Sequence, residues 1–164
     1  MLLRRDAMEK GVVGAMRQSL RLLSLETRGE GFTDITAALD GEIAASGLDT
    51  GIAVISCQHT SASLTVNENA DPRVLADLTA YLRALVPREG VRPISGRGEL
   101  RAYVHDDEGA DDMPAHIRTA LTCSSLSQSF QAGRLLLGTW QAVYLWEHRA
   151  APQRRRICLH LIGE

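Results

Sequence analysis

The chain alternates between two faces along Gly51-Ile52-Ala53-Val54-Ile55-Ser56-Cys57-Gln58-His59. Side chains of a β-strand point to opposite faces with a period of two. Ile52, Val54 and Ser56 therefore share one face, and the apolar Ala53 and Ile55 share the other with Cys57 and His59. The alternation predicts a strand with a buried face, and residues 61–67 predict a second strand almost directly after it.

The segments on either side of this run predict both helices and strands. Helices are expected from Thr33 or Asp34 to Gly47, from Asp71-Pro72 to Pro87, and from Met113-Pro114 onward, because each begins with a capping residue or an early proline. Further strands are expected over residues 16–28, 100–104, 124–131, 134–148 and 154–162, with a long loop over 87–99. This order predicts an α+β fold with about three helices and a mostly antiparallel sheet.

Composition limits the classes of protein that the chain can belong to. Its 164 residues are 45% hydrophobic and 23% charged, with a formal net charge of −2. These values predict one domain over residues 16–164 with a loosely attached N-terminal extension over residues 1–15. They do not favour nucleic-acid binding, which needs an excess of Lys and Arg. No membrane span or signal peptide is expected, and three widely spaced cysteines favour the reducing cytoplasm.

Charged and imidazole groups are concentrated in His105-Asp106-Asp107-Glu108-Gly109-Ala110-Asp111-Asp112-Met113-Pro114-Ala115-His116. Five carboxylates and two histidines fall where a predicted strand gives way to a predicted helix. Unpaired charges are costly to bury, whereas His and carboxylate groups suit divalent cations and proton transfer. The alternative is an exposed acidic loop whose aspartates cap the helix.

Three histidines from separate elements form the candidate ligand set. His59 and His105 are expected at strand ends, and His116 in the first turn of a helix. They can converge on one cation, with a ligand or supporting carboxylate from Asp106, Glu108, Asp111 or Asp112. Imidazoles favour Zn²⁺ or another transition metal, and Mg²⁺ fits only with a phosphate substrate.

Other polar residues are candidates for substrate contacts. Glu68, between Asn67 and Asn69, is either a general base or part of a turn. Gly138-Thr139-Trp140-Gln141 lies within a predicted strand, where glycine often marks a bulge or a close ligand approach. Trp140 fits the core or a subunit interface as well as a stacking surface. Glu147-His148-Arg149 can form a solvated strand end or a polar pocket wall.

Four ordered blocks of the chain resemble the YjbQ-like family. They are Gln58 to Thr65, Asn67 to Pro72, His105 to His116, and Gly138 to Gln141 with Glu147 to Arg149, and the resemblance continues to the Ile162-Gly163-Glu164 end. It implies a β-sandwich-like α+β domain, a homotrimer, and a metal-binding pocket near the subunit boundary. It also implies a weak thiamine-phosphate synthase activity, which joins a pyrimidine methyl pyrophosphate to a thiazole phosphate and releases pyrophosphate.

Two hypotheses follow from these residues and the resemblance. The first is a trimeric metal-dependent enzyme that acts on a small phosphorylated metabolite. His59, His105 and His116 would bind the metal, and Glu68, His59 and Asp112 would serve catalysis. Substrate contacts would come from Ser61, Asn67, Trp140, Gln141 and Arg149. The second is a non-catalytic trimeric module that binds a metabolite or a metal.

Overall fold

The alternating run at Gly51 forms β3 (Thr50–Cys57), the central strand of a five-stranded sheet. The structure, a computed structural model, describes residues 15–93 and 95–164. The sheet has the order β1-β8-β3-β5-β6, and every pair is antiparallel. The direct neighbours of β3 are β5 (Ser125–Gln131) and β8 (Arg154–Gly163), and the outer strands are β6 (Arg134–Leu135) and β1 (Arg17–Glu26).

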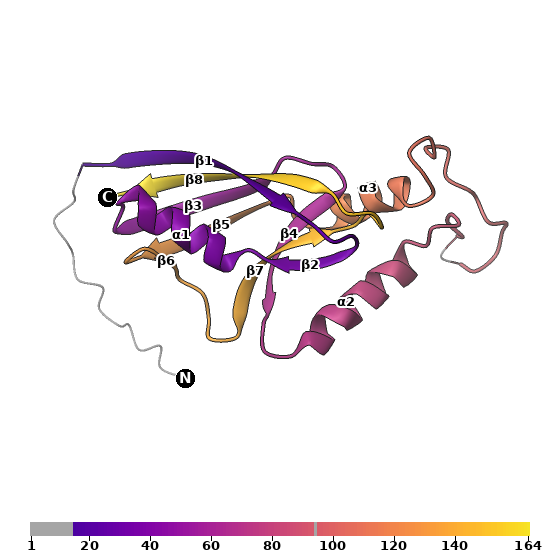
Figure 1. Cartoon of the computed structure of the whole chain (residues 1–164). Helices are drawn as coiled ribbons and strands as arrows, with labels where there is room; N and C mark the ends of the chain where they lie inside the picture. The colour runs from indigo at the N-terminus through magenta and orange to yellow at the C-terminus, as the bar shows by residue number, and fades with distance from the viewer. Residues whose placement is uncertain (1–14, 94) are drawn as a thin grey trace.

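A three-stranded sheet faces this one and closes the core (Figure 1). It contains β2 (Gly31–Asp34), β7 (Gln141–Glu147) and β4 (Ala62–Glu68), again all antiparallel. The inward faces of both sheets pack together, with Ile55, Leu159 and Leu145 fully buried between them. The prediction of an α+β fold with a mostly antiparallel, sandwich-like sheet is confirmed.

Helix α1 (Thr36–Ser46) covers the open side of this core. Leu39 and Ile43, four residues apart, are both fully buried, because residues at this spacing lie on one helix face. The Asp34 carboxylate accepts a hydrogen bond from the Thr36 N–H at 2.9 Å. The helix ends at Gly47 in the left-handed region, with φ 67°, as a C-terminal glycine allows. The predicted end at Gly47 is confirmed, whereas the N-cap position is occupied by Ile35 and not by Thr33 or Asp34 as predicted.

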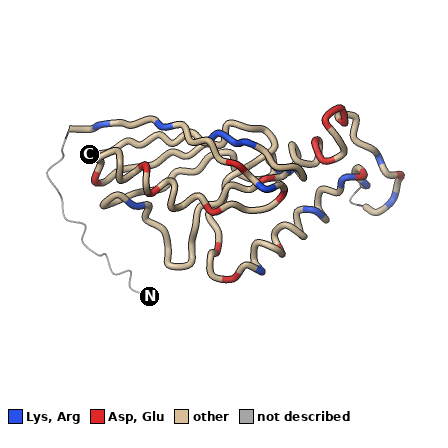
Figure 2. The backbone as a smooth tube through the Cα atoms, viewed as in Figure 1, with Lys and Arg blue, Asp and Glu red and all other residues tan. Residues whose placement is uncertain are grey.

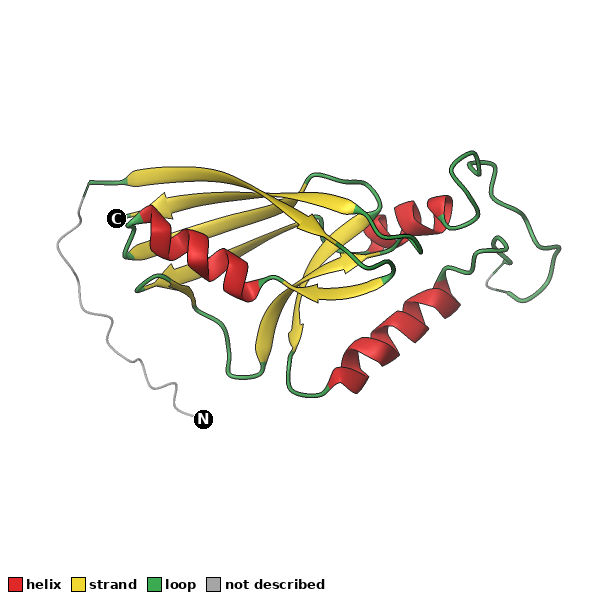
Figure 3. Cartoon of the chain, in the orientation of Figure 1, coloured by secondary structure: helices red, strands yellow, loops and turns green. Residues whose placement is uncertain are grey.

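The other two helices lie at the end of the sandwich opposite to the C-terminus. They are α2 (Pro72–Leu85) and α3 (Asp112–Leu121). Asp71 caps α2 by accepting from the Arg73 N–H, with Pro72 at the first helical position, as predicted. Figure 3 shows α2 standing away from the sheets. Consequently Tyr81 and Leu85 of its apolar stripe remain 70% and 55% exposed.

Three details of the predicted elements are wrong. Residues 100–104 form no strand, and a single bridge joins Arg101 to Val91. The strand predicted over 134–148 is broken by a turn, in which the Gln141 side chain accepts from the Gly138 N–H. The short strand β2 was missed, because four residues carry too little alternation to be recognised.

Two further predictions concern the chain ends and membranes. The N-terminal extension predicted over residues 1–15 lies, apart from Ala15, outside the described residues. Within the described ranges, none of the helices has the length and apolar character needed to cross a membrane.

Candidate metal centre

The acidic segment runs through a loop into α3, and this junction assembles a cluster of three side chains. Asp112 and His116 lie four residues apart, so both project from one face of the helix. His105 reaches them from the preceding loop: its Nε2 lies 2.9 Å from Asp112 Oδ2. His116 Nε2 lies 3.5 Å from Asp112 Oδ1. Potential ligand atoms of the three residues lie within 4.8 Å of one another.

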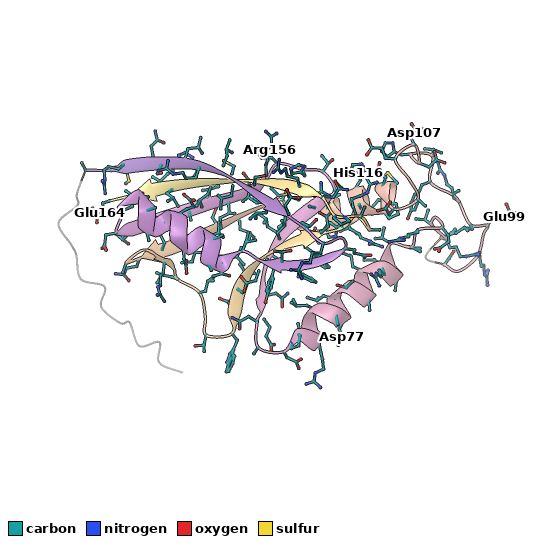
Figure 4. All side chains as sticks on the ribbon, viewed as in Figure 1. Asp77, Glu99, Asp107, His116, Arg156 and Glu164 are labelled. Carbon is teal, nitrogen blue, oxygen red and sulfur yellow. The ribbon has the colours of Figure 1, made fainter. Side chains whose placement is uncertain are left out.

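A backbone contact decides how the His116 ring is oriented. Its Nδ1 lies 2.9 Å from the carbonyl oxygen of Thr60. A carbonyl oxygen can only accept, so Nδ1 carries the proton and Nε2 presents its lone pair to the cluster. This arrangement, with one ring nitrogen held by a carbonyl, is typical of histidines that bind metals. Figure 4 shows His116 on α3, while Asp107 lies at the outer tip of the loop before it.

Arg149 holds the carboxylates around this cluster. Its guanidinium donates to Asp112 Oδ1, to Asp111 Oδ2 at 3.2 Å and to the Glu108 carbonyl at 2.7 Å. Burial opposes ionisation of Asp111, but the Ala150 N–H and Arg149 outweigh it and lower the pKa of Asp111. Asp112 is 2% exposed, and among the described residues the 2.9 Å contact with the His105 ring is the one polar contact of its Oδ2. Asp112 therefore has one oxygen bound by Arg149 and one turned towards His105.

His59 lies outside this cluster. It follows β3 by two residues, and its Nε2 accepts a hydrogen bond from the Arg156 N–H at 2.8 Å. Burial, followed by the positive charges of Arg155 and Arg156, lowers its pKa. The neutral ring then carries its proton on Nδ1. The structure thus brings together two of the three histidines proposed as ligands. The Nε2 lone pair of His59 accepts the Arg156 N–H and is therefore not free to bind a metal.

A pocket of about 630 Å³ connects His59 to the cluster. Its walls include both His59 and His116, together with Thr60 and Thr119. Cys57 also lines it, but burial raises the pKa of that thiol. Cys57 therefore stays protonated and has the character of a buried structural cysteine. The pocket offers polar groups and room for a small molecule directly beside His116.

The candidates at the far end of the sandwich do not reach this pocket. Strands β4 and β7 pair from Ala62↔Glu147 at the metal end to Glu68↔Gln141 at the other. Six residues of extended chain span about 20 Å, so Glu68 lies that far from the cluster within one chain. Asn67 is next to Glu68, and Trp140 is 66% exposed on the adjoining turn. The structure therefore separates these residues from the histidines.

A buried polar layer, which the sequence reading missed, lies beneath the cluster. Glu147 is fully buried and accepts from Arg155 Nε at 2.7 Å and from Thr27 at 3.0 Å. Arg155 also donates to Ser61 Oγ at 3.0 Å, so Ser61 has a structural partner. The alternation of side chains along β8 could have predicted this burial from the sequence, because it turns Arg155 inward while Arg154 and Arg156 stay exposed.

His148 belongs to the same layer. It is 1% exposed, and its Nε2 lies 2.9 Å from Ser63 Oγ. Burial, and then the charge of Arg118, lowers its pKa from 6.5 to about 4. His148 is therefore neutral at pH 7, and the sequence reading gave no indication of its deep burial.

The fold and the cluster define an α+β protein with a candidate metal centre where a loop meets α3. The chain belongs to the family described as UPF0047 protein YjbQ-like, whose model matches residues 21–164. The family expected from the sequence blocks is thereby confirmed.

Relatives and solved structures cover nearly the whole chain. It is 43% identical to a UPF0047 protein of Synechocystis sp., over 90% of this chain and 94% of that protein. It is 41% identical to the UPF0047 protein YjbQ of Salmonella typhimurium, over 88% and 97%. A crystal structure of an uncharacterized YjbQ/UPF0047 family protein from Clostridium acetobutylicum superposes with a TM-score of 0.71. It is 34% identical and covers 86% of this chain and 98% of that one.

Proposed function

We propose that His105, Asp112 and His116 bind a divalent transition metal, and that the protein is a metal-dependent enzyme acting on a small phosphorylated metabolite. The observation that carries the proposal is the oriented cluster itself. Two imidazoles and a buried carboxylate face one another, and the Thr60 carbonyl directs the His116 lone pair towards the group.

The separations within the cluster suit a tetrahedral ion. Metal–ligand bonds of about 2.0–2.1 Å place ligand atoms about 3.3 Å apart in a tetrahedron. The distance of 2.9 Å between His105 Nε2 and Asp112 Oδ2 is close to that value, and His116 Nε2 lies 3.5 Å from the other oxygen of the same carboxylate. Asp112 Oδ2 is the oxygen open to the ion, while Arg149 keeps Oδ1. Two imidazoles favour Zn²⁺ or a similar metal over Mg²⁺.

Chemistry on a phosphorylated substrate would use the pocket beside His116. The metal would act as a Lewis acid on a phosphate or pyrophosphate oxygen. His59 is suited to donate its Nδ1 proton to a substrate oxygen in the same pocket. The thiamine-phosphate synthase reaction, in which pyrophosphate leaves, is one reaction of this class. Glu68 can take part only if a second subunit supplies it, because of its distance within the chain.

The metal content of tag-free protein tests the proposal. Mass spectrometry should find close to one metal per chain, which His105→Ala and His116→Ala should each abolish. His59→Ala is the matched control and should retain the metal, because His59 lies outside the cluster. Full metal content in His105→Ala or His116→Ala would show that the ligand assignment is wrong. Turnover of a panel of phosphorylated compounds with and without a chelator then tests the enzymatic part.

A non-catalytic metabolite- or metal-binding module is the second candidate. It is favoured by the Arg149 guanidinium, which donates to Asp111 Oδ2 and Asp112 Oδ1 and so occupies two carboxylate oxygens that could otherwise act as bases. This function predicts ligand-dependent thermal stabilisation without turnover. Product formation from any phosphorylated compound would exclude it.

A homotrimer is proposed from the uncovered side of the five-stranded sheet. Leu20, Leu22 and Ile52 are 58%, 61% and 51% exposed there, and exposed apolar patches mark association surfaces. Light scattering should report three chains in the wild type and a lower mass in Leu22→Asp. A monomeric wild type would refute this assembly. The three cysteines are unpaired, which supports a location in the reducing cytoplasm.

A further inference from the structure

A second group of charged side chains lies on the other side of α3. Arg118 follows His116 by two residues, which is about 200° around a helix of 3.6 residues per turn. Its guanidinium therefore points away from the candidate metal centre. There it meets Glu30 from the turn before β2, and Arg83 from the last turn of α2. Figure 2 shows basic residues gathered along this end of α2 and the loop that follows it.

Three guanidinium groups share the Glu30 carboxylate. Arg118 donates to Glu30 Oε1 at 2.7 Å, and Arg83 donates to both oxygens at 3.0 Å. Arg88 approaches Oε2 at 3.6 Å. The Glu30 side chain is 7% exposed, so this carboxylate is committed to the arginines around it. It balances only one of their three positive charges.

These arginines line a pocket of about 380 Å³. Its walls are formed by Arg83, Arg88 and Arg118, with Pro87 and the one acidic residue Glu89. With Glu30 and Glu89 counted against the three guanidiniums, the group retains one net positive charge. A pocket of this size accommodates a small ligand, and the unbalanced charge favours an anionic one.

One buried donor of this pocket has no partner. Arg118 is 2% exposed, and its NH2 group donates to the Val86 carbonyl at 2.9 Å. Its Nε, also buried, makes no hydrogen bond with the part of the chain that the structure describes. Buried N–H groups are almost always hydrogen-bonded, so this Nε–H leaves the positive charge of Arg118 incompletely compensated beside the pocket. Burial and the nearby Arg88 and Arg83, incompletely offset by Glu30, also lower the pKa of Arg118.

We propose that Arg83, Arg88 and Arg118 form a binding site for a phosphate oxyanion, separate from the candidate metal centre. The outward N–H groups of Arg88 and Arg83 donate to the phosphate oxygens, and the charge of the buried Arg118 guanidinium beside them adds to the attraction. Guanidinium groups match the geometry of phosphate oxygens and form strong charge-assisted hydrogen bonds with them. The pocket has room beyond the phosphate itself, which fits a small phosphorylated molecule.

Isothermal titration calorimetry of the full chain with inorganic phosphate tests this site, at constant ionic strength set with chloride and with EDTA present. Arg88→Gln is the informative variant, because the 3.6 Å contact with Glu30 is the one ion pair of Arg88 among the described residues and its side chain is 45% exposed. Its loss should leave the fold intact and weaken phosphate binding about tenfold or more, since charge-assisted hydrogen bonds contribute on that scale. Arg73→Gln is the matched control, because it removes the same charge from the opposite end of α2.

Four outcomes decide the proposal. Saturable binding that Arg88→Gln weakens and Arg73→Gln preserves supports it. Absence of saturable binding at millimolar phosphate overturns it, and so does equal weakening by both variants, which would indicate non-specific attraction. Binding abolished by His116→Ala but unaffected by Arg88→Gln would place the phosphate at the metal centre and also overturn it. This last variant separates the site from the proposed function, whose metal content is measured independently.

A comparison of ligands identifies the source of the oxyanion. Glycerol phosphate that binds at least as tightly as inorganic phosphate supports a phosphorylated metabolite. Binding of inorganic phosphate alone supports free phosphate as the natural ligand. Acetate and citrate that bind more tightly than either would contradict the assignment to phosphate.

Discussion

His148 should make the protein less stable as the pH falls below neutrality. The pKa of its buried ring is lowered to about 4, against 6.5 in an unfolded chain. Between these values the unfolded chain takes up a proton that the folded chain rejects, so acid favours unfolding. The stabilisation is complete above pH 6.5 and is lost progressively as the pH falls to about 4. A difference of 2.5 pKa units corresponds to about 3 kcal/mol in total.

The part of this loss that lies between pH 7 and pH 5 is about 2 kcal/mol by the same linkage. Most carboxylates remain ionised over that interval, which makes it the clearest window for a histidine. His148→Gln should retain a polar side chain near Ser63 without titrating. Its free energy of unfolding should therefore fall by about 2 kcal/mol less than that of the wild type between the two pH values.

Urea unfolding followed by tryptophan fluorescence measures the effect. The Trp146 ring lies 5.2 Å from the His148 ring, and a Trp140→Phe background leaves Trp146 as the single reporter. All measurements are made at one subunit concentration, so that the degree of subunit association is the same in each. His160→Gln, the same replacement on the half-exposed outer side of β8, is the matched control and should behave as the wild type. Identical pH dependence in the wild type and His148→Gln would refute the reasoning.

Three other predictions address the core and the metal centre. Arg155→Met should destabilise the fold by about 3–5 kcal/mol, because it leaves Glu147 buried without its partner. In urea titrations the double variant Arg155→Met/Glu147→Gln should recover part of that loss. A double variant that is no more stable than Arg155→Met would contradict this prediction. Gly51→Ala should lower the thermal midpoint, because its Cβ would lie 2.2 Å from the Ile162 carbonyl oxygen, whereas Gly41→Ala, with open space around it, is the control. Zn²⁺ at 100 times its Kd should stabilise the wild type by about 2.7 kcal/mol in the same titrations. The stability of His116→Ala should not change. Equal stabilisation of both proteins would show that the ion binds outside the cluster.

Local patterns were sufficient for most of the secondary structure. The alternation from Gly51 predicted β3, and Asp71-Pro72 and Gly47 marked helix ends that the structure confirms. Each of these signals acts within one turn or one strand, so neighbouring residues determine it. The short strand β2 and the interrupted segment before β7 were misread because their hydrogen-bond partners lie far away in the chain.

Only part of the candidate site could be predicted from the sequence. Asp112 and His116 share a helix face by their spacing alone, and the acidic segment drew attention to both. Packing between separate elements decides two further features. It sets the loop path that brings His105 to them, and it places the Arg156 N–H where His59 accepts its hydrogen bond. The pairing register of β4 with β7 sets the distance to Glu68, and no local pattern encodes it.

The sequence by itself thus determined an α+β domain, the family, and a segment rich in potential metal ligands. Only the tertiary structure decided which ligands meet, that Arg155 is buried against Glu147, and that Arg83, Arg88 and Arg118 gather around Glu30. Glu30 is separated from Arg83 and Arg118 by 53 and 88 residues. Contacts over such separations form because burying the apolar faces of the sheets and helices fixes where each element lies, and the charged groups then take the partners within reach.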